Sequence, residues 1–285
     1  MKRVNTIKEV RSYLENPGKT TIGFVPTMGA LHNGHISLVK AAAETSDVTV
    51  VSIFVNPTQF NDPEDLKNYP RTIDDDLSLL SRVLGENDIV FIPEVNEIYP
   101  EPDNRVFSFG NLDRVMEGLH RPGHFNGVAQ VVSKLFDIVR PCMVFFGQKD
   151  FQQLTIIREL VRQTGSRIKV IGCPIIREPD GLAMSSRNKL LDPEIRQRAG
   201  IIYRTISEAA KMAGKMDIPE IRNYVFETIN GTPGFNIEYF EVADDFELKL
   251  LKNKSDIISR RKYFGCIAVR GGKIRLIDNV ELPLR

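Results

Sequence analysis

The hydrophobic positions of the first 180 residues form short apolar runs that alternate with amphipathic stretches. Five runs, bounded by polar or turn-forming residues, predict strands: 20–27, 48–55, 88–93, 143–147 and 167–176. Four stretches between them have one apolar side and the lengths of helices: 36–46, 74–86, 127–140 and 150–165. Apolar strands that alternate with helices of about 10–15 residues are typical of a parallel sheet covered on both faces. We therefore predict a doubly wound α/β domain over residues 1–180.

The pattern changes in the remaining third of the chain. Residues 192–214 predict one long amphipathic helix with Asp192 at its N-cap. A second helix and three strand-like runs follow: 217–231, 235–244, 262–270 and 273–282. Gly271-Gly272 is a two-residue hairpin signal between the last two runs. Helices followed by an antiparallel meander predict a smaller α+β domain over residues 181–285.

Charge and composition argue against several classes of protein. The chain has 38 Lys+Arg and 37 Asp+Glu, whereas a protein that binds nucleic acid usually carries a basic excess. No apolar run reaches the roughly 18 residues of a membrane span, and charges interrupt the N-terminus where a signal peptide would be apolar. We expect no nucleic-acid partner, no membrane association and a cytoplasmic location. Cys142, Cys173 and Cys266 fit no disulfide or zinc pattern, so we expect all three in the core.

The stretch GFVPTMGALHNGH ends the first predicted strand and begins a helix, and it contains His32, His35 and the glycines Gly29 and Gly34. In an open parallel sheet, ligands bind beyond the carboxyl ends of the strands. A helix N-terminus presents unpaired N–H groups and positive potential, which suit phosphate. Neither a P-loop nor a dinucleotide fingerprint is present, so backbone N–H groups and imidazoles would be the phosphate donors. One histidine could instead cap the helix while the other is solvated, and a zinc pair would lack further ligands nearby.

Six sequence blocks extend this observation: PTMGALHNGH, SIFVNPTQF, DLKNYPRT, RPGHFNGV, FGQKDFQQ and DGLAMSSRN. HNGH resembles the H-x-G-H signature of the nucleotidyltransferase superfamily. The ordered blocks together resemble the pantothenate synthetase (pantoate–β-alanine ligase) family over nearly the whole chain. This resemblance implies a Rossmann-like ATP- and pantoate-binding domain, residues 1–180, and a C-terminal lid domain, residues 181–285. It further implies ATP-dependent condensation of pantoate with β-alanine to pantothenate through a pantoyl adenylate, release of AMP and pyrophosphate, a requirement for Mg²⁺, and a homodimer.

The resemblance also assigns residues to ATP: Met28, Gly29, His32, Gly34, His35, Gly147, Lys149, Asp150, Ile176, Met184, Ser185, Ser186 and Arg187. His32, His35, Lys149 and Arg187 would be the catalytic groups among them, because they can stabilise charge on phosphates. Asp150 suits a helix N-cap equally well. The 185–187 segment resembles the K-M-S-K-S loop of the superfamily, with Arg187 where that pattern ends in Lys-Ser.

A second set is assigned to pantoate: Pro26, Met28, Gln59, Val128, Val131, Val132 and Gln153. A glutamine amide both donates and accepts, as a ligand with hydroxyl and carboxylate groups requires. The three valines would face the two methyl groups of pantoate, although ordinary helix core explains each of them equally well.

Asp75 and Asp76 are the magnesium candidates by resemblance, since Mg²⁺ prefers carboxylate and phosphate oxygens. Capping competes with this interpretation, because Thr72 as N-cap places Asp75 at the third helical position, close to a capping box. His120 and His124 lie in a glycine-containing segment, which we interpret as structural or substrate-shaping.

Two other functions are compatible with parts of the pattern. An enzyme that adenylylates a phosphate ester would need a second basic pocket, whereas this chain offers the neutral Gln59 and Gln153. A nucleotide-binding regulatory module without chemistry should have lost part of the phosphate-binding set, which is complete here.

Overall fold

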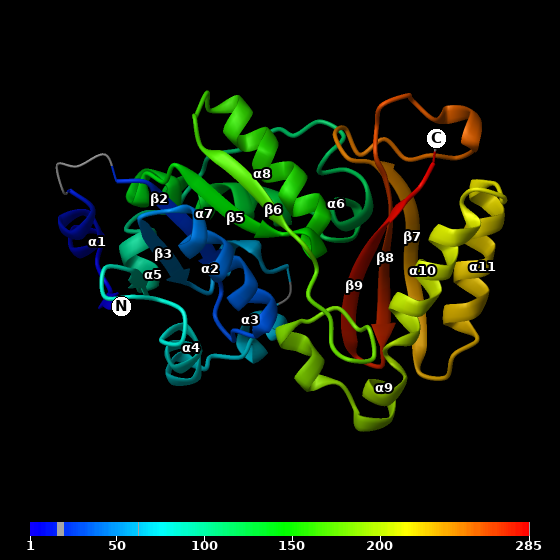
Figure 1. Ribbon diagram of the computed structural model, residues 1–285, viewed down its shortest axis with the longest axis horizontal. Coiled ribbons are helices and arrows are strands. Elements are labelled where there is room, and N and C mark those ends of the chain that lie inside the picture. Colours follow the sequence, from blue (N-terminus) through cyan, green and yellow to red (C-terminus); the bar gives the residue numbers. More distant parts are fainter. Residues whose placement is uncertain (16–19, 62, 285) are drawn as a thin grey trace.

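The computed structural model describes residues 1–15, 20–61 and 63–284. Figure 1 shows a parallel sheet with helices beside a smaller antiparallel sheet. The strands are β1 (Lys2–Val4), β2 (Ile22–Thr27), β3 (Val48–Ile53), β4 (Ile89–Phe91), β5 (Met143–Gly147), β6 (Lys169–Cys173), β7 (Phe235–Asp244), β8 (Tyr263–Gly271) and β9 (Ile274–Leu282). The α-helices are α1 (Ile7–Leu14), α2 (Asn33–Thr45), α3 (Pro63–Asn68), α4 (Ile73–Leu80), α5 (Val95–Ile98), α6 (Met116–His120), α7 (His124–Val139), α8 (Phe151–Gln163), α9 (Pro193–Arg198), α10 (Ile201–Met212) and α11 (Ile218–Asn230). Short 3₁₀ turns are η1 (Pro57–Gln59), η2 (Gln148–Asp150), η3 (Ser186–Leu190) and η4 (Lys254–Asp256).

The first sheet has the order β1-β4-β3-β2-β5-β6, and every neighbouring pair is parallel. The five predicted strands of this domain are confirmed. The edge strand β1 was not predicted, since two of its three residues are charged. The strand order reverses at β2, which pairs with β3 on one side and β5 on the other. Such a switch point opens a crevice beyond the carboxyl ends of the strands.

Side chains of each strand alternate between two hydrophobic layers. Phe24 and Phe146 belong to a cluster with α1, α7 and α8. Their neighbours Val25 and Phe145 belong to a cluster with α2 and α4. The sheet is therefore covered on both faces, as the continuous apolar runs of its strands predict.

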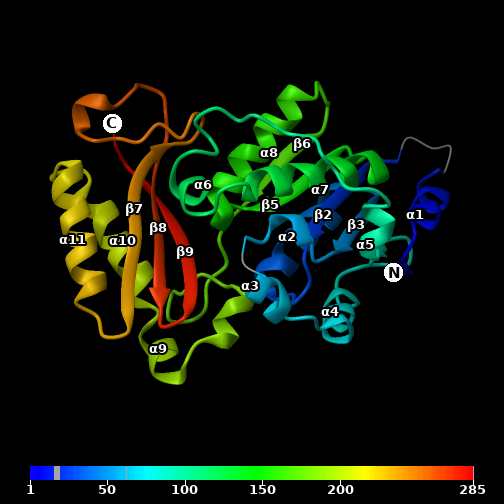
Figure 2. The same cartoon turned by 180° about the vertical axis from the view of Figure 1, so that it is seen from behind.

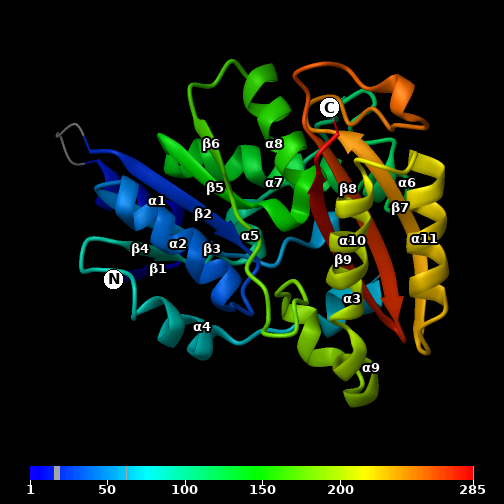
Figure 3. The same ribbon diagram turned by 45° about the vertical axis from the view of Figure 1, so that its right-hand side comes forward.

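The antiparallel sheet has the order β7-β8-β9, and Figure 3 shows α10 and α11 beside it. Phe240 and Ile267 cluster with these two helices. Tyr239 and Phe264 of the same strands join the core that contains α7 and α8, and the rings of Phe264 and Phe151 lie 4.5 Å apart. The C-terminal sheet is thus packed on both faces. Because its residues share a core with the first part, a domain boundary at residue 180 stays a prediction.

The prediction of one helix over residues 192–214 is wrong. Asp192 caps α9 by accepting from Glu194 N–H at 3.0 Å, but the helix ends at Arg198 and α10 begins at Ile201. Backbone bonds at the break span three residues, as between Ile202 N–H and the Ala199 carbonyl. Gly200 packs so closely on Asp180 that a Cβ would lie 2.5 Å from its carbonyl oxygen. The hydrophobic periodicity of residues 192–214 could not indicate this contact, because Asp180 lies in a separate loop.

Smaller differences concern turns and helix ends. The β8–β9 hairpin turn is Gly272-Lys273, one residue later than predicted, because Gly271 pairs with Ile274. The predicted helix over 74–86 ends at Leu80, and Thr72 occupies its N-cap without a capping side-chain bond. The helix predicted over 127–140 begins earlier, at His124.

The expectation that all three cysteines lie in the core has a mixed outcome. Cys173 and Cys266 are buried as predicted, but the core assignment of Cys142 is wrong, because this residue is exposed. Among the described residues no helix is both long and apolar enough to span a membrane.

Candidate functional site

A cavity of about 220 Å³ lies where the loops after β2 and β5 meet. It collects most of the predicted site residues: Pro26, Met28, His32, Gly34, His35, Gln59, Val128, Val131, Val132, Gly147, Lys149, Asp150, Gln153, Ile176, Met184, Ser185, Ser186 and Arg187. Gly29, Asp75 and Asp76 are absent from its lining. Residues that the sequence analysis did not assign also line it: Thr27, Leu38, Phe54, Asn56, Tyr69, Leu135, Phe145, Phe146, Pro174 and Ile175.

His32 and His35 form a capping box at the N-terminus of α2. The N–H of Gly34 donates to Nδ1 of His32 at 3.1 Å, and the N–H of His32 donates to Nδ1 of His35 at 3.3 Å. The ring centroids are 4.1 Å apart. Both imidazoles are therefore fixed in orientation by the helix that they cap.

Burial determines the charge of the two histidines, and the hydrogen bonds determine their tautomers. Burial, with a smaller contribution from the charge of Lys149, lowers the pKa of His32 to about 3 and that of His35 to about 4. Both rings are neutral near pH 7. A neutral imidazole that accepts at Nδ1 carries its proton on Nε2. Each ring in the cavity lining thus offers one N–H donor, so capping and anion binding are compatible roles of the same side chain.

Lys149 and Asp150 lie in η2, directly after β5. Nζ of Lys149 is 3.9 Å from an oxygen of Asp150, and the lysine side chain is only 19% exposed. Asp150 occupies the N-cap of α8 without making a capping side-chain bond, so its carboxylate stays available to a ligand. The amide of Asn279 donates to the carbonyls of Gln148 and Lys149 at 2.9 and 3.0 Å. The C-terminal sheet therefore positions the backbone of this turn.

The 185–187 segment also lines the cavity, next to the histidine loop. The hydroxyl of Ser186 donates to the carbonyl of Ala30 at 2.9 Å, which joins this segment to the histidine loop. Arg187 forms an ion pair with Asp65 of α3 at 3.1 Å. Its side chain is 31% exposed, and an ion pair that water partly screens is weak enough to exchange for a phosphate.

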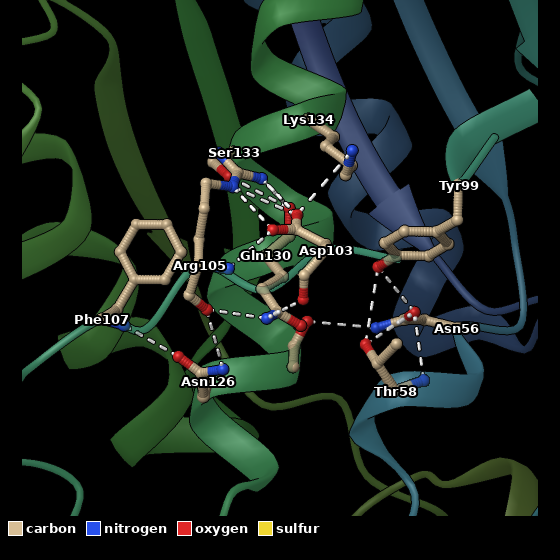
Figure 4. A network of polar contacts seen from close by, with 11 residues as sticks. Asn56, Thr58, Tyr99, Asp103, Arg105, Phe107, Asn126, Gln130, Ser133 and Lys134 are labelled. Atoms are coloured by element: carbon tan, nitrogen blue, oxygen red, sulfur yellow. Dashed lines mark hydrogen bonds and ion pairs between the residues drawn. The ribbon is translucent and has the colours of Figure 1, made fainter. Parts of the chain in front are cut away.

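Gln59 and Met28 lie at the end of the cavity where η1 meets α7. The amide of Gln59 donates to Sδ of Met28, and Asn56 donates to the side-chain oxygen of Gln59 at 3.2 Å. Figure 4 shows how Asn56 is fixed in turn, since its oxygen accepts from the hydroxyl of Tyr99 at 2.9 Å. Gly127 permits the close approach of α7, because a Cβ there would lie 2.3 Å from the Thr58 carbonyl oxygen.

Two faces of α7 have different partners. On one face, Gln130 donates to the carbonyls of Asp103 and Arg105, both at 2.8 Å, as part of the network in Figure 4. Val128, Val131 and Val132 line the cavity from the other face. They also belong to the hydrophobic core, so the core and cavity-wall interpretations of these valines hold together.

Asp76 has a different environment from the one predicted for a metal ligand. Its carboxylate is buried and accepts from Leu31 N–H at 2.7 Å and from Ala30 N–H at 2.9 Å. The hydroxyl of Thr72 donates to it at 3.2 Å. Ala30 has a φ of 49°, in the left-handed region. Asp76 therefore stabilises the strained turn that leads into His32.

The two predicted magnesium ligands do not fit a directly bound ion. Both oxygens of Asp76 already accept hydrogen bonds from the loop. Asp75 is exposed and lies outside the cavity lining. Among the described residues no group of three or more His, Cys, Asp or Glu could hold a metal ion.

Replacing Asp76 by asparagine should lower the free energy of unfolding by about 2 kcal/mol, because an amide leaves one buried N–H of the loop without an acceptor. Urea denaturation measures this change. The same substitution at the exposed Asp75 is the matched control and should change stability little. If D76N instead kept normal stability while needing much more Mg²⁺ for activity, Asp76 would be a metal ligand and the positioning role would be wrong.

Asn56 and Tyr69 are polar cavity residues that the sequence analysis did not assign. Both lie inside blocks that carry the family resemblance, SIFVNPTQF and DLKNYPRT. Their place in these blocks was the available signal, but nothing local distinguished them from loop residues.

Comparisons with known proteins give one consistent result. A model of the pantoate-beta-alanine ligase family matches residues 2–281. Pantothenate synthetase of Phocaeicola vulgatus is 52% identical over 285 residues, which cover 99% of each chain. The crystal structure of pantothenate synthetase from Thermus thermophilus is similar with a TM-score of 0.90, 39% identity and 99% of each chain covered. Pantoate-beta-alanine ligase from Francisella tularensis, complexed with beta-gamma ATP and beta-alanine, gives a TM-score of 0.78 and 37% identity, with 98% of this chain and 97% of that chain covered.

Proposed function

The chain belongs to the pantoate-beta-alanine ligase family, and we propose how its cavity carries out the reaction. The enzyme joins pantoate to β-alanine with the use of ATP and forms pantothenate. The observation that carries the mechanism is a pair of neutral histidines that cap α2 and share one cavity with Gln59 and Gln153. The cavity therefore offers hydrogen-bond donors for phosphate beside neutral amide groups for a hydroxy acid.

ATP binds with its phosphates at the N-terminus of α2. The Nε2–H groups of His32 and His35 donate to phosphate oxygens, and Lys149 contributes a positive charge from the adjacent turn. Ser185, Ser186 and Arg187 bind the same oxygens from the neighbouring segment of the cavity lining. Arg187 exchanges its contact with Asp65 for the phosphates. The proximity of Ser186 to the histidine loop supports this arrangement.

Pantoate binds between Gln59 and Gln153. The two amides pair with its hydroxyl and carboxylate groups, and Met28 and the valines of α7 contact its methyl groups. This placement sets the pantoate carboxylate beside the phosphate-binding end of the same cavity. Gln153 and Lys149 lie one helical turn apart and both line the cavity, which supports this placement of pantoate.

The chemistry then proceeds in two steps. A pantoate carboxylate oxygen attacks the α-phosphorus of ATP, an O–P bond forms, and the bond to pyrophosphate breaks. The amine of β-alanine attacks the carbonyl carbon of the resulting pantoyl adenylate, a C–N bond forms, and AMP leaves as the amine loses a proton. No protein nucleophile is needed. Positioning and stabilisation of phosphate charge account for the catalysis.

Two further features stay proposals from the family. Mg²⁺ accompanies ATP, but Asp75 and Asp76 do not fit it as direct ligands. The chain forms a homodimer. A cytoplasmic location, which we expect from the sequence, also stays a proposal.

Isotope exchange without β-alanine tests the order of the two steps. The enzyme should exchange labelled pyrophosphate into ATP in the presence of pantoate alone, because adenylate formation is reversible and does not need the amine. Omission of pantoate should abolish the exchange. A strict requirement for β-alanine would instead indicate a concerted or differently ordered reaction.

A further inference from the structure

Two neighbouring residues of β9, Asp278 and Asn279, hold the two segments that carry the proposed phosphate-binding side chains outside the histidine loop. Figure 2 shows β9 as the strand of the C-terminal sheet that lies toward the parallel sheet. Each of the two residues is only 3% exposed. Neither is among the substrate contacts proposed above, so the proposed reaction gives them no direct role.

Asn279 holds the turn that carries Lys149. Its side-chain amide donates to the carbonyls of Gln148 and Lys149 at 2.9 and 3.0 Å. An asparagine amide has two N–H donors, and here they serve consecutive residues of η2. The backbone from which the Lys149 side chain extends is therefore fixed relative to β9.

Asp278 holds the segment between β6 and η3 through Arg177. The guanidinium of Arg177 donates to both carboxylate oxygens of Asp278, at 2.6 and 3.0 Å, and to the carbonyl of Gly181 at 3.1 Å. It also lies over the ring of Tyr203, 3.6 Å from the ring centroid. A two-pronged contact between arginine and a carboxylate fixes orientation as well as distance. Arg177 is therefore fixed between β9, α10 and its own loop.

Arg177 lies in the first arm of a short hairpin whose second arm leads into the 185–187 segment. The N–H of Met184 donates to the carbonyl of Ile176 at 2.9 Å, and Arg177 pairs with Ala183 in an antiparallel bridge. Because the two arms are in register, anchoring Arg177 also fixes the point from which the phosphate-binding side chains of the 185–187 segment extend.

We propose that the Asp278–Asn279 pair is a positioning element, which sets the separation of Lys149 and the 185–187 segment so that both reach the same phosphate oxygens during adenylate formation. The two residues act through the segments that they hold, rather than by contact with the substrate. The inference rests on the proposed ligase function. It adds that the C-terminal sheet supports the first chemical step, because a displacement of about 1 Å in a reacting site can cost about 10²-fold in rate.

Asn279→Leu tests the contact with the Lys149 turn, because leucine is close to asparagine in size and shape but donates no hydrogen bond. At saturating ATP and pantoate, N279L should slow the pantoate-dependent exchange of pyrophosphate about 10- to 10²-fold. In a chain that already carries K149M, the same substitution should slow the exchange less than about twofold, since no ammonium is left to position. Equal slowing in the two chains would overturn the positioning role of Asn279.

Asn236→Leu is the matched control, because Asn236 is exposed on β7 of the same sheet and lines neither the large cavity nor the Lys149 turn. N236L should leave the exchange unchanged in both chains. If N279L does not fold, Asn279→Ala replaces it, since a methyl group removes the donor without a clash, and the same coupling to K149M is expected.

Asp278→Asn tests the second contact, because it keeps the size of the side chain but removes the charge that holds Arg177. D278N should slow the exchange about tenfold. In a chain that already carries Arg187→Ala it should slow the exchange less than about threefold, because the charge that the hairpin positions is then missing. The same loss in both chains would contradict the role of Asp278.

The pKa values of His32 and His35 provide a readout that needs no reaction. The charge of Lys149 lowers both, and a turn released from Asn279 would hold this charge less closely. N279L should therefore raise both pKa values in an NMR titration, whereas N236L should not. Unchanged values in N279L would overturn the inference. Failure of the unchanged enzyme to exchange pyrophosphate would instead overturn the proposed adenylate mechanism and leave the positioning of Lys149 to be decided by this titration.

Discussion

Replacing His35 by alanine is expected to slow pantoate-dependent pyrophosphate exchange about 10²- to 10³-fold, the usual loss for one preorganised donor to a developing negative charge. The reason is that the neutral ring, which takes part in the cap of α2, donates its Nε2–H into the cavity. Burial holds the pKa of His35 at about 4, so the ring acts as a hydrogen-bond donor rather than as a cation. The initial rate of exchange at saturating ATP and pantoate measures the effect.

Two further variants separate the donor from the cap. His35→Asn keeps an acceptor close to the position of Nδ1 but has no donor where Nε2 was, so it should be nearly as slow as H35A and close to normal in stability. His35→Gln can place an N–H near the position of Nε2, so it should recover part of the rate. Near-normal exchange by H35N would remove the imidazole from the mechanism and leave His35 with a capping role alone.

Replacing Lys149 by methionine should lower the kcat/KM for ATP about 10²- to 10³-fold, since its charge lies at the phosphate-binding end of the cavity and methionine keeps most of its volume. The lysine side chain is largely buried, and its contact with Asp150 is long, so the charge stays available to a phosphate. Steady-state kinetics with ATP as the varied substrate measure the loss.

A second readout identifies this loss as electrostatic. Lys149 lowers the pKa of both His32 and His35, so K149M should raise both pKa values, as NMR titration would record. Lys134 is the matched control, because it lies outside the cavity and pairs with Asp103 in the network of Figure 4. Unchanged histidine pKa values in K149M would contradict the placement of its charge beside the pair.

The strand and helix pattern was sufficient to place His32, His35 and Lys149 at one edge of the sheet. Both loops follow strands with continuous apolar runs, and the carboxyl ends of parallel strands share an edge. The capping box was harder to predict, because His is an unusual capping residue. The pattern therefore left capping and phosphate binding as alternatives, although the geometry allows both.

Contacts between distant segments account for most of what the sequence did not predict. Asp76 accepts from residues 45 and 46 positions earlier in the chain, so its role could not be distinguished from metal binding by local spacing. Gly200 interrupts a helical pattern because of its contact with Asp180.

The most direct test of the central claim is the fate of oxygen in pantoate. Pantoate labelled with ¹⁸O in its carboxylate should transfer one labelled oxygen to AMP when ATP and β-alanine are supplied, and mass spectrometry of the AMP measures this. The label follows from attack of the carboxylate on the α-phosphorus, because the new O–P bond stays with AMP when the amide forms. AMP without ¹⁸O would contradict the pantoyl adenylate and the assignment of the cavity that depends on it.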